Sequence, residues 1–171
     1  MNNIFIHNTT RVDYADIGKG TKIWHWSHIC DKAVIGENCT IGQNVYIGPK
    51  VRIGSGCKIQ NNVYIPEGII IGDDVFIGPG VTFTNIKRPD ARIEQKDKFL
   101  ETVVGDHVVI GANATILPGL RLKKNCFIGA GSVVTRNIEE DEMVVGNPAR
   151  HFYDYRGRYN ECYPNSTRIR F

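Results

Sequence analysis

An aliphatic side chain recurs at every sixth position through most of this chain. Counting in sixes from Ile17 to Phe83 gives twelve consecutive apolar positions, of which eleven are isoleucine. The count restarts in a new phase at Val104 and continues to Val134. Neither the period of about 3.6 residues of an α-helix nor the period of two of an extended strand explains a period of six. We therefore expect each six-residue unit to be a short strand and a turn, with one bulky side chain pointing inward.

Two other columns of the repeat carry residues that suit tight corners. Glycine follows the inward aliphatic ten times, and the residue three positions after the aliphatic is mostly Gly, Asn or Asp. These three residue types tolerate positive φ, so the second column predicts the corners of a solenoid with flat faces. It accounts for six of the 18 glycines. It also accounts for the asparagines Asn38, Asn44, Asn62, Asn113, Asn125 and Asn137.

Composition indicates one globular domain and excludes several functions. The chain has 171 residues, 42% of them hydrophobic and 23% charged, and a net charge of +3. That charge is small and no basic run is interleaved with aromatics, so nucleic acid is not expected as a partner. No apolar stretch approaches the roughly 18 residues of a membrane span, and the first residues do not resemble a signal peptide. The five cysteines form no CxxC pair, which favours a reduced, cytoplasmic chain.

Three departures from the repeat are the places where we expect function, since the repeat itself is scaffold. In residues 24–28 (WHWSH), tryptophans occupy the glycine and corner positions. Between Phe83 and Val104 the chain gains fifteen residues beyond the normal six, and the insertion is rich in charged side chains, which predicts an exposed loop over 85–102. The third departure is the end of the repeat. We therefore expect a β-helix over 1–149 with one projecting loop, followed by a short tail over 150–171.

Asn85 lies at the root of the predicted loop. The other asparagines of the repeat occupy the corner column, where backbone geometry explains them, but Asn85 does not. We therefore expect Asn85 to have a chemical role. Cys39 and Cys57 lie 18 residues apart, and we expect them to stack in the core as filler and not as a redox pair.

Several stretches of the chain resemble known enzymes. In the second half, IGANATI, IGAGSVVT and VGNPAR resemble the coenzyme A-binding end of hexapeptide acetyltransferases. In the first half, TKIWHWSHI, IQNNVYI and VFIGPGVTFTN resemble the nucleotide-sugar 3-N-acetyltransferases. Those enzymes acetylate UDP-2-acetamido-3-amino-2,3-dideoxyglucuronate or dTDP-3-amino-3,6-dideoxyhexoses. The resemblance implies an all-β, left-handed parallel β-helix with three units to a coil, although the general crossover rule favours a right hand.

The resemblance also implies a homotrimer, with active sites in the grooves between copies, and acetyl-CoA as co-substrate. Small residues that match the family's coenzyme-binding stretches are Gly111, Ala112, Ala130 and Gly131. Basic residues placed by sequence to meet the coenzyme A phosphates are Lys123, Lys124, Arg136 and Arg150. The whole net charge of +3 arises after residue 149, near those phosphates. On the sugar side the expected residues are Gln60, Asn61, Asn62, Thr84 and Arg88.

The implied reaction is attack of a sugar amine on a thioester carbonyl. In the family the asparagine matching Asn85 binds the amine, but an amide cannot take a proton at neutral pH. We therefore expect direct attack, with Asn85 as positioner and the backbone N–H of Gly111 or Ala112 as oxyanion donor. The proton would pass to the leaving thiolate or to solvent. His25 and His28 are the alternative general bases, and no metal is expected.

Other functions remain open at this point. An acetyltransferase for serine, a sugar hydroxyl or an antibiotic is one alternative, and a non-catalytic β-helical scaffold subunit is another. A γ-class carbonic anhydrase would need three histidines around zinc, and none of the five histidines has that class's H-x4-H spacing. The reaction would belong to surface polysaccharide synthesis, such as that of lipopolysaccharide. The sequence leaves open whether the nucleotide is UDP or dTDP, and whether the hexose carries a 6-carboxylate or a 6-methyl group.

Overall fold

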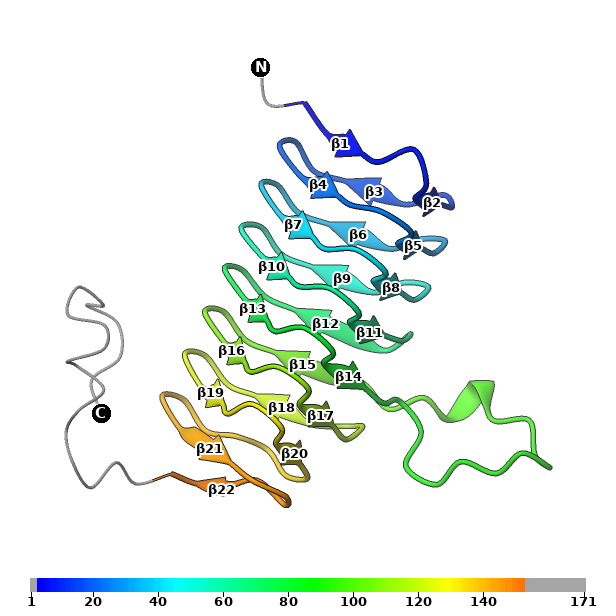
Figure 1. The fold of residues 1–171 in the computed structure, drawn as a ribbon. Coiled ribbons are helices and arrows are strands. Elements are labelled where there is room, and N and C mark those ends of the chain that lie inside the picture. Colours follow the sequence, from blue (N-terminus) through cyan, green and yellow to red (C-terminus); the bar gives the residue numbers. More distant parts are fainter. Residues whose placement is uncertain (1–2, 153–171) are drawn as a thin grey trace, which may run out of the picture.

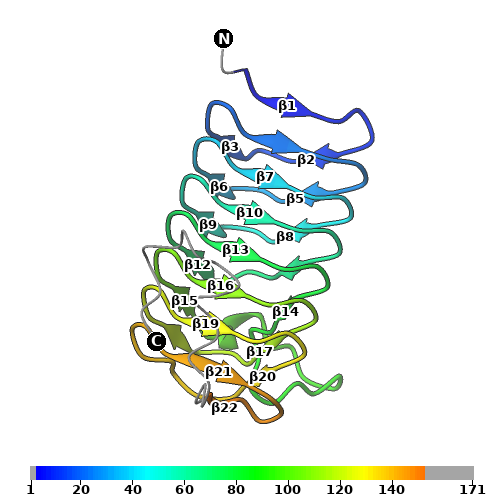
Figure 2. The ribbon, with the colours of Figure 1, turned by 60° about the vertical axis from the view of Figure 1, so that its left-hand side comes forward.

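The chain winds into a parallel β-solenoid of about eight turns (Figure 1). The structure is a computed structural model, and it describes residues 3–152. Strands of two or three residues stack coil on coil into three sheets, as the rotated view also shows (Figure 2). The solenoid of hexapeptide repeats expected from the sequence is confirmed.

Each of the first six coils contributes one strand to each sheet. Sheet A contains β1 (Phe5–Ile6), β4 (Lys22–Ile23), β7 (Thr40–Ile41), β10 (Lys58–Ile59), β13 (Phe76–Ile77), β16 (Val109–Ile110), β19 (Phe127–Ile128), β21 (Met143–Val145) and β22 (Arg150–His151). Sheet B contains β2 (Arg11–Val12), β5 (His28–Ile29), β8 (Tyr46–Ile47), β11 (Tyr64–Ile65), β14 (Thr82–Phe83), β17 (Thr115–Ile116) and β20 (Val133–Val134). Sheet C contains β3 (Asp16–Ile17), β6 (Val34–Ile35), β9 (Arg52–Ile53), β12 (Ile69–Ile71), β15 (Thr102–Val104) and β18 (Arg121–Leu122).

The inward aliphatic column forms the core. Ile23 pairs with Ile41 and Ile29 with Ile47, so neighbouring coils are 18 residues apart, and all four side chains are fully buried. Burying a side chain of this size stabilises the fold by about 2 kcal/mol. Cys39, Cys57 and Cys126, which directly follow corner residues, are buried free thiols that fill the core.

Three edges join the sheets, and they are named here for the sheets that they connect. The A–B edge comprises residues 24–27, 42–45, 60–63, 78–81, 111–114 and 129–132. The B–C edge comprises residues 13–15, 30–33, 48–51, 66–68, 84–101, 117–120 and 135–137. The C–A edge comprises residues 18–21, 36–39, 54–57, 72–75, 105–108, 123–126 and 139–142.

The corner column has positive φ, as expected, with one exception. All six predicted corner glycines and five of the six predicted asparagines adopt it. Asn137 does not, because the last coil is shorter between sheets B and C: Ile138 bridges Leu122, only 16 residues earlier, and the next corner is Asp141 on the C–A edge, at φ 59°. The Asn137 side chain instead accepts a hydrogen bond from the Arg121 backbone N–H at 2.9 Å.

The tryptophan-rich stretch does not interrupt the backbone. Trp26 adopts φ 57° as an ordinary corner residue, and the coil on either side keeps its 18-residue register. The departure is therefore one of side-chain chemistry alone. Trp26 keeps 63% of its surface exposed.

The inserted loop leaves the solenoid between sheets B and C and projects away from it (Figure 1). It runs from residue 84 to 101 and contains one 3-10 turn, η1 (Lys96–Lys98). The Leu100 N–H donates to the Asn85 carbonyl at 2.8 Å, which ties the two ends of the loop together at its root.

Strand β22 closes the solenoid by pairing antiparallel with β21. Arg150 and His151 therefore belong to sheet A, although the predicted boundary at 149/150 placed them in the tail. The remaining tail arginines, at 156, 158, 168 and 170, lie outside the described residues. Within residues 3–152, no helix is long and apolar enough to cross a membrane.

Candidate functional site

Two hollows border the root of the loop on the B–C edge. The aromatic hollow, on the side of the N-terminal coils, is lined by Tyr46, Lys50, Tyr64, Glu67, Asn85 and Phe99 among others. The apolar hollow, on the side of the C-terminal coils, is lined by Thr84, Lys87, Leu100, Leu117, Leu120 and Thr135 among others. In each hollow, residues of the solenoid form one wall and residues of the inserted loop form the other. The root of the loop therefore separates two hollows on this edge, each large enough for a ligand.

Asn85 is held by hydrogen bonds that leave one atom available. Its Nδ2 donates to the Glu67 carbonyl at 3.0 Å, and its own carbonyl accepts from Leu100. A backbone carbonyl can only accept, so the amide nitrogen must face Glu67 and Oδ1 must face away from it. No donor among residues 3–152 bonds to that oxygen, and the side chain is half-buried. Asn85 therefore presents a fixed acceptor beside the aromatic hollow.

An aromatic row on the outer face of sheet B leads to this hollow. His28 meets Tyr46 edge-on at 5.7 Å between ring centroids, and Tyr46 stacks on Tyr64 at 5.1 Å. A hydrogen bond to Cys30, together with burial, raises the pKa of Tyr46 to about 12. The phenol therefore stays protonated at neutral pH and acts as a hydrogen-bond donor.

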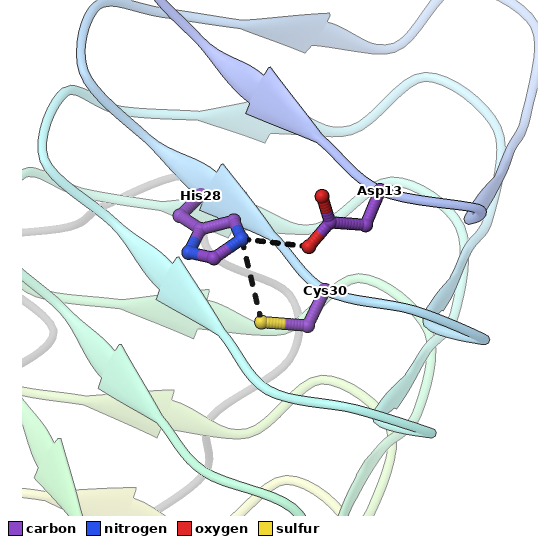
Figure 3. A group of neighbouring side chains, drawn as sticks. All are labelled: Asp13, His28 and Cys30. Carbon is purple, nitrogen blue, oxygen red and sulfur yellow. Dashed lines mark hydrogen bonds and ion pairs between the residues drawn. The ribbon is translucent and has the colours of Figure 1, made fainter.

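His28, one of the two alternative bases, is already engaged. Its Nε2 lies 2.9 Å from Asp13 Oδ2 and 3.8 Å from Cys30 Sγ (Figure 3). Hydrogen bonds from His28 and then Arg11 hold the pKa of Asp13 below its usual value. His28 is thus part of a local polar cluster three coils from Asn85 and does not line either hollow.

His25, the other alternative base, lies on the A–B edge in an aromatic cluster. Its ring centroid is 3.6 Å from that of His7, and it also contacts Trp24 and Trp26. Phe5 in turn packs on Trp24 at 5.2 Å. His25 therefore lies on the A–B edge, whereas His28 lies in strand β5 of sheet B.

The residues predicted to bind the sugar lie on two different edges of the solenoid. Gln60, Asn61 and Asn62 lie on the A–B edge, where scaffold hydrogen bonds explain two of them. The Asn61 side chain accepts from the Gln43 N–H at 2.9 Å, and the Asn62 side chain accepts from Asn44 at 2.9 Å. Gln60 has no such explanation among the described contacts.

Thr84 and Arg88 accompany Asn85 on the B–C edge. The Thr84 hydroxyl donates to the Ile116 carbonyl at 3.0 Å and borders the apolar hollow. Arg88 is exposed on the loop, and its carbonyl accepts from Gln95 at 3.1 Å. Of the predicted sugar-side residues, only these two lie near Asn85 in one chain.

The small residues predicted to contact coenzyme A all lie on the A–B edge. A Cβ on Gly111 would come within 2.5 Å of the Ala130 nitrogen, so close stacking of coils already requires glycine there. Gly131 has φ +69° and no atom within 4 Å of such a Cβ. Ala112 is half-buried and Ala130 is exposed.

One predicted oxyanion donor is ruled out by the backbone ladder. The Gly111 N–H donates to the Ile128 carbonyl at 2.8 Å, so it is not available to a ligand. Ala112 is then the remaining member of that pair. Its carbonyl accepts from Gly131, while no acceptor for its own N–H is recorded within residues 3–152.

The predicted basic residues do not form one cluster. Lys123 and Lys124 lie on the C–A edge, Arg136 on the B–C edge and Arg150 on β22. Lys123 pairs with Glu139, and Arg136 binds Glu142 through two hydrogen bonds of 2.6 and 3.1 Å. The Arg136 contact holds the pKa of Glu142 at about 2. Lys123 and Arg136 thus already have anionic partners.

Several residues of this region were missed from the sequence. Tyr46 and Tyr64 lie 18 residues apart, so coil stacking alone would have placed them side by side. Asp13 and Cys30 each directly follow an inward aliphatic on the same edge, as Gly48 does. Asp13 and Cys30 could not be paired by the 18-residue rule, because the first two coils pair at 17 residues, Arg11 with His28.

The chain is similar to known transferases over most of its length. The model of the bacterial transferase hexapeptide (six repeats) family matches residues 14–49, 50–85 and 101–136, and the gap between the last two coincides with the loop. The chain is 47% identical over 146 residues to the dTDP-3-amino-3,6-dideoxy-alpha-D-galactopyranose 3-N-acetyltransferase of Aneurinibacillus thermoaerophilus. That match covers 85% of this chain and 76% of the relative.

Two further similarities are more partial. A galactoside O-acetyltransferase of Lactococcus lactis is 36% identical over 77 residues, which cover 43% of this chain and 37% of that one. A hexapeptide-repeat containing acetyltransferase of Vibrio cholerae, solved in complex with acetyl coenzyme A, superimposes with a TM-score of 0.52 and 27% identity. The superposition covers 72% of this chain and 70% of that one.

Proposed function

This chain belongs to the hexapeptide-repeat acetyltransferase family, and we propose that it transfers an acetyl group from acetyl-CoA to the 3-amino group of a nucleotide-linked amino sugar. The observation that carries the proposal is Asn85, whose Oδ1 is fixed as an acceptor at the loop root. The relative with 47% identity acts on a nucleotide-linked 3-amino sugar, which supports this choice of substrate class. Such acetylation would serve the synthesis of surface glycan precursors.

Asn85 positions the attacking amine in this proposal. A neutral amine donates one N–H to Oδ1, which orients its lone pair away from the amide. The amide cannot accept a proton at neutral pH, so the amine attacks directly and loses its proton to the leaving thiolate or to solvent. Asn85 therefore contributes by proximity and orientation.

The apolar hollow fits an acyl and pantetheine chain. Leu100, Leu117 and Leu120 supply an apolar wall on the far side of the loop root from the aromatic hollow. Acetyl-CoA supplies the acetyl group as an activated thioester. The N–H of Ala112 is the backbone donor that we assign to the developing oxyanion, since Gly111 is engaged in the ladder.

The predicted residues on the B–C edge and those on the A–B edge can form one site only if two copies of the chain pack together. Asn85 lies on the B–C edge and Ala112 on the A–B edge, so in one chain sheet B separates them. A homotrimer that packs the A–B edge of one copy against the loop of the next would bring both sets into one groove. We therefore propose that each active site is shared between two copies.

Transfer to a hydroxyl is the second candidate, favoured by the similarity to a galactoside O-acetyltransferase. A hydroxyl needs a general base to become a good nucleophile, and histidine usually serves. Neither hollow is lined by a histidine. The amine therefore remains the better acceptor for this site.

An acceptor panel tests the proposal. The full chain is incubated with acetyl-CoA and, in separate reactions, UDP- and dTDP-linked 3-amino sugars, a galactoside and serine, and free thiol release is followed. We expect turnover with a nucleotide-linked 3-amino sugar and little with the hydroxyl acceptors. Turnover with the galactoside or serine alone would contradict the proposal, and no thermal shift with acetyl-CoA would indicate a scaffold protein.

A further inference from the structure

The polar cluster on the first two coils holds three donor groups of different chemistry. Asp13 follows β2, His28 lies on β5 and Cys30 follows β5, so two stacked coils bring them together (Figure 3). One ligand atom from each residue lies within 4.8 Å of the other two. We propose that these residues form a binding site for a divalent transition-metal ion of the zinc type.

The three groups converge on one point and do not form a relay. In a Cys–His–Asp nucleophile arrangement, the carboxylate and the thiol contact different ring nitrogens. Here both contact His28 Nε2, at 2.9 Å from Asp13 Oδ2 and 3.8 Å from Cys30 Sγ. One ring nitrogen cannot satisfy a carboxylate and a thiolate through a single proton, whereas a cation placed between the three atoms can.

The two spacings from His28 Nε2 match a tetrahedral zinc centre with small adjustments. Zinc bonds of about 2.0–2.1 Å to nitrogen and about 2.3 Å to sulfur imply a nitrogen–sulfur separation of about 3.6 Å. The observed 3.8 Å is close to that value. The contact from His28 to Asp13 would lengthen by a few tenths of an ångström, which the half-exposed carboxylate can accommodate.

The donor set selects the type of ion. Calcium and magnesium prefer oxygen ligands alone, whereas a mixed set of thiolate, imidazole and carboxylate favours zinc. The surroundings hold the donors in place: Cys30 is 7% exposed, and Arg11 Nε donates to the other Asp13 oxygen at 2.9 Å. This second contact orients the carboxylate, as outer-shell partners of metal ligands do.

Three ligands leave the fourth position of the ion open. Side-chain exposures of 36% for His28 and 29% for Asp13 give a path from solvent. The proposed site differs from the expectation, drawn from the sequence, that no metal is bound. It does not depend on the proposed acetyl transfer. Since the ligands come from two coils, a bound ion would also clamp the first two coils of the solenoid together.

Cobalt is the probe that tests this site, because thiolate ligation to Co²⁺ gives an intense near-ultraviolet absorption. The full chain, first treated with chelator, is titrated with Co²⁺ and then with Zn²⁺. We expect one equivalent of Co²⁺ per chain, with that absorption, and its loss when Zn²⁺ displaces the cobalt. The matched control is Cys126→Ser, which removes a buried thiol remote from any histidine contact and should leave the spectrum unchanged.

Two variants decide the outcome. Cys30→Ser should abolish the near-ultraviolet absorption, and Asp13→Asn should weaken Co²⁺ affinity by about tenfold or more. Asp13 is half-exposed, so its variant keeps the test valid if Cys30→Ser does not fold. Absence of saturable Co²⁺ binding overturns the proposal, as does an absorption that both variants retain. Neither result depends on acetyl transfer, so failure here leaves the proposed function to its own test.

Discussion

The two edges that flank sheet B are built from the same repeat, yet they carry different chemistry. On the A–B edge the corner residues continue without interruption from Trp26 to Gly131, and polar side chains such as Asn62 bond to the next coil. On the B–C edge a loop is inserted, and Asn85 keeps a side-chain oxygen with no scaffold partner among the described residues. Where the coils repeat regularly, side chains such as Asn62 use their hydrogen-bonding groups on a neighbouring coil. Where the loop interrupts the repeat, the Oδ1 of Asn85 stays available to a ligand.

The largest contrast between the edges should appear on replacing an asparagine of each. Asn85→Ala removes the acceptor that positions the amine and also the side-chain bond to Glu67, so we expect a loss of about 100-fold in kcat/KM and a stability cost of about 1 kcal/mol. Asn62→Ala, the matched control, removes a hydrogen bond between coils and should cost about 1 kcal/mol of stability with little change in kcat/KM. Steady-state kinetics and thermal unfolding of both variants measure the contrast. Equal losses of activity would remove the distinction between the edges.

Two glycines sharpen the account of the A–B edge as scaffold. Gly111→Ala places a Cβ within 2.5 Å of a backbone nitrogen, so the coils must separate, and we expect a cost of about 2 kcal/mol. Gly131→Ala meets no atom but must keep φ +69°, which should cost about 1 kcal/mol. Denaturant unfolding of the two variants shows which substitution lowers the free energy of unfolding more. A larger cost at Gly131 would show that backbone strain, and not coil contact, limits this edge.

The lower end of the B–C edge should respond to pH through one ion pair. Arg136 holds the pKa of Glu142 at about 2, below its ordinary value of 4.5, so the pair stabilises the fold above about pH 4.5. That stability is lost as the pH falls towards 2. Glu142→Gln should cost about 2 kcal/mol at pH 7 and close to nothing at pH 2. Thermal unfolding of the unmodified protein and of Glu142→Gln is measured from pH 7 to pH 2. The same dependence of Tm on pH in both would show that the ion pair between Arg136 and Glu142 does not stabilise the fold.

The smallest effects are expected from the histidines, if the amine attacks without a base. His25 is packed among aromatic rings and His28 is bound to Asp13, so we expect changes in kcat below about tenfold for His25→Ala and His28→Ala. The acid limb of the kcat profile against pH should be retained in both. A histidine variant that abolishes turnover and flattens that limb would establish a general base.

The fold was predictable from the sequence because one period governs the core and the corners alike. The same logic failed at Asn137, since two residues are missing from the last coil between sheets B and C and the corner there is lost. It held at Trp26, where a bulky residue adopts the same positive φ as the other corner residues. The sequence pattern gives the type of side chain at each position of the repeat, whereas the backbone conformation there depends on hydrogen bonding to the neighbouring coils.

The candidate site was predictable only in part. Asn85 was identifiable because it lies two residues after the inward Phe83, outside the corner column and at the root of the insertion. Cys30 and Asp13 were not, because their proximity depends on which edge each turn occupies, and that follows from the assignment of strands to sheets. The availability of Gly111 was misjudged for a related reason: its N–H is engaged by Ile128 in the coil that follows.

The central claim is that Asn85 on the B–C edge of one copy works with the A–B edge of another. Complementation tests it, with Asn85→Ala as one variant and Ala130→Trp, which fills the groove from an exposed position, as the other. Each variant alone should be nearly inactive. In trimers formed at random from equal amounts of the two, about a quarter of the sites would combine an intact loop with an intact A–B edge. The account predicts recovery of about a quarter of the unmodified activity, and a mixture as inactive as its components would contradict it.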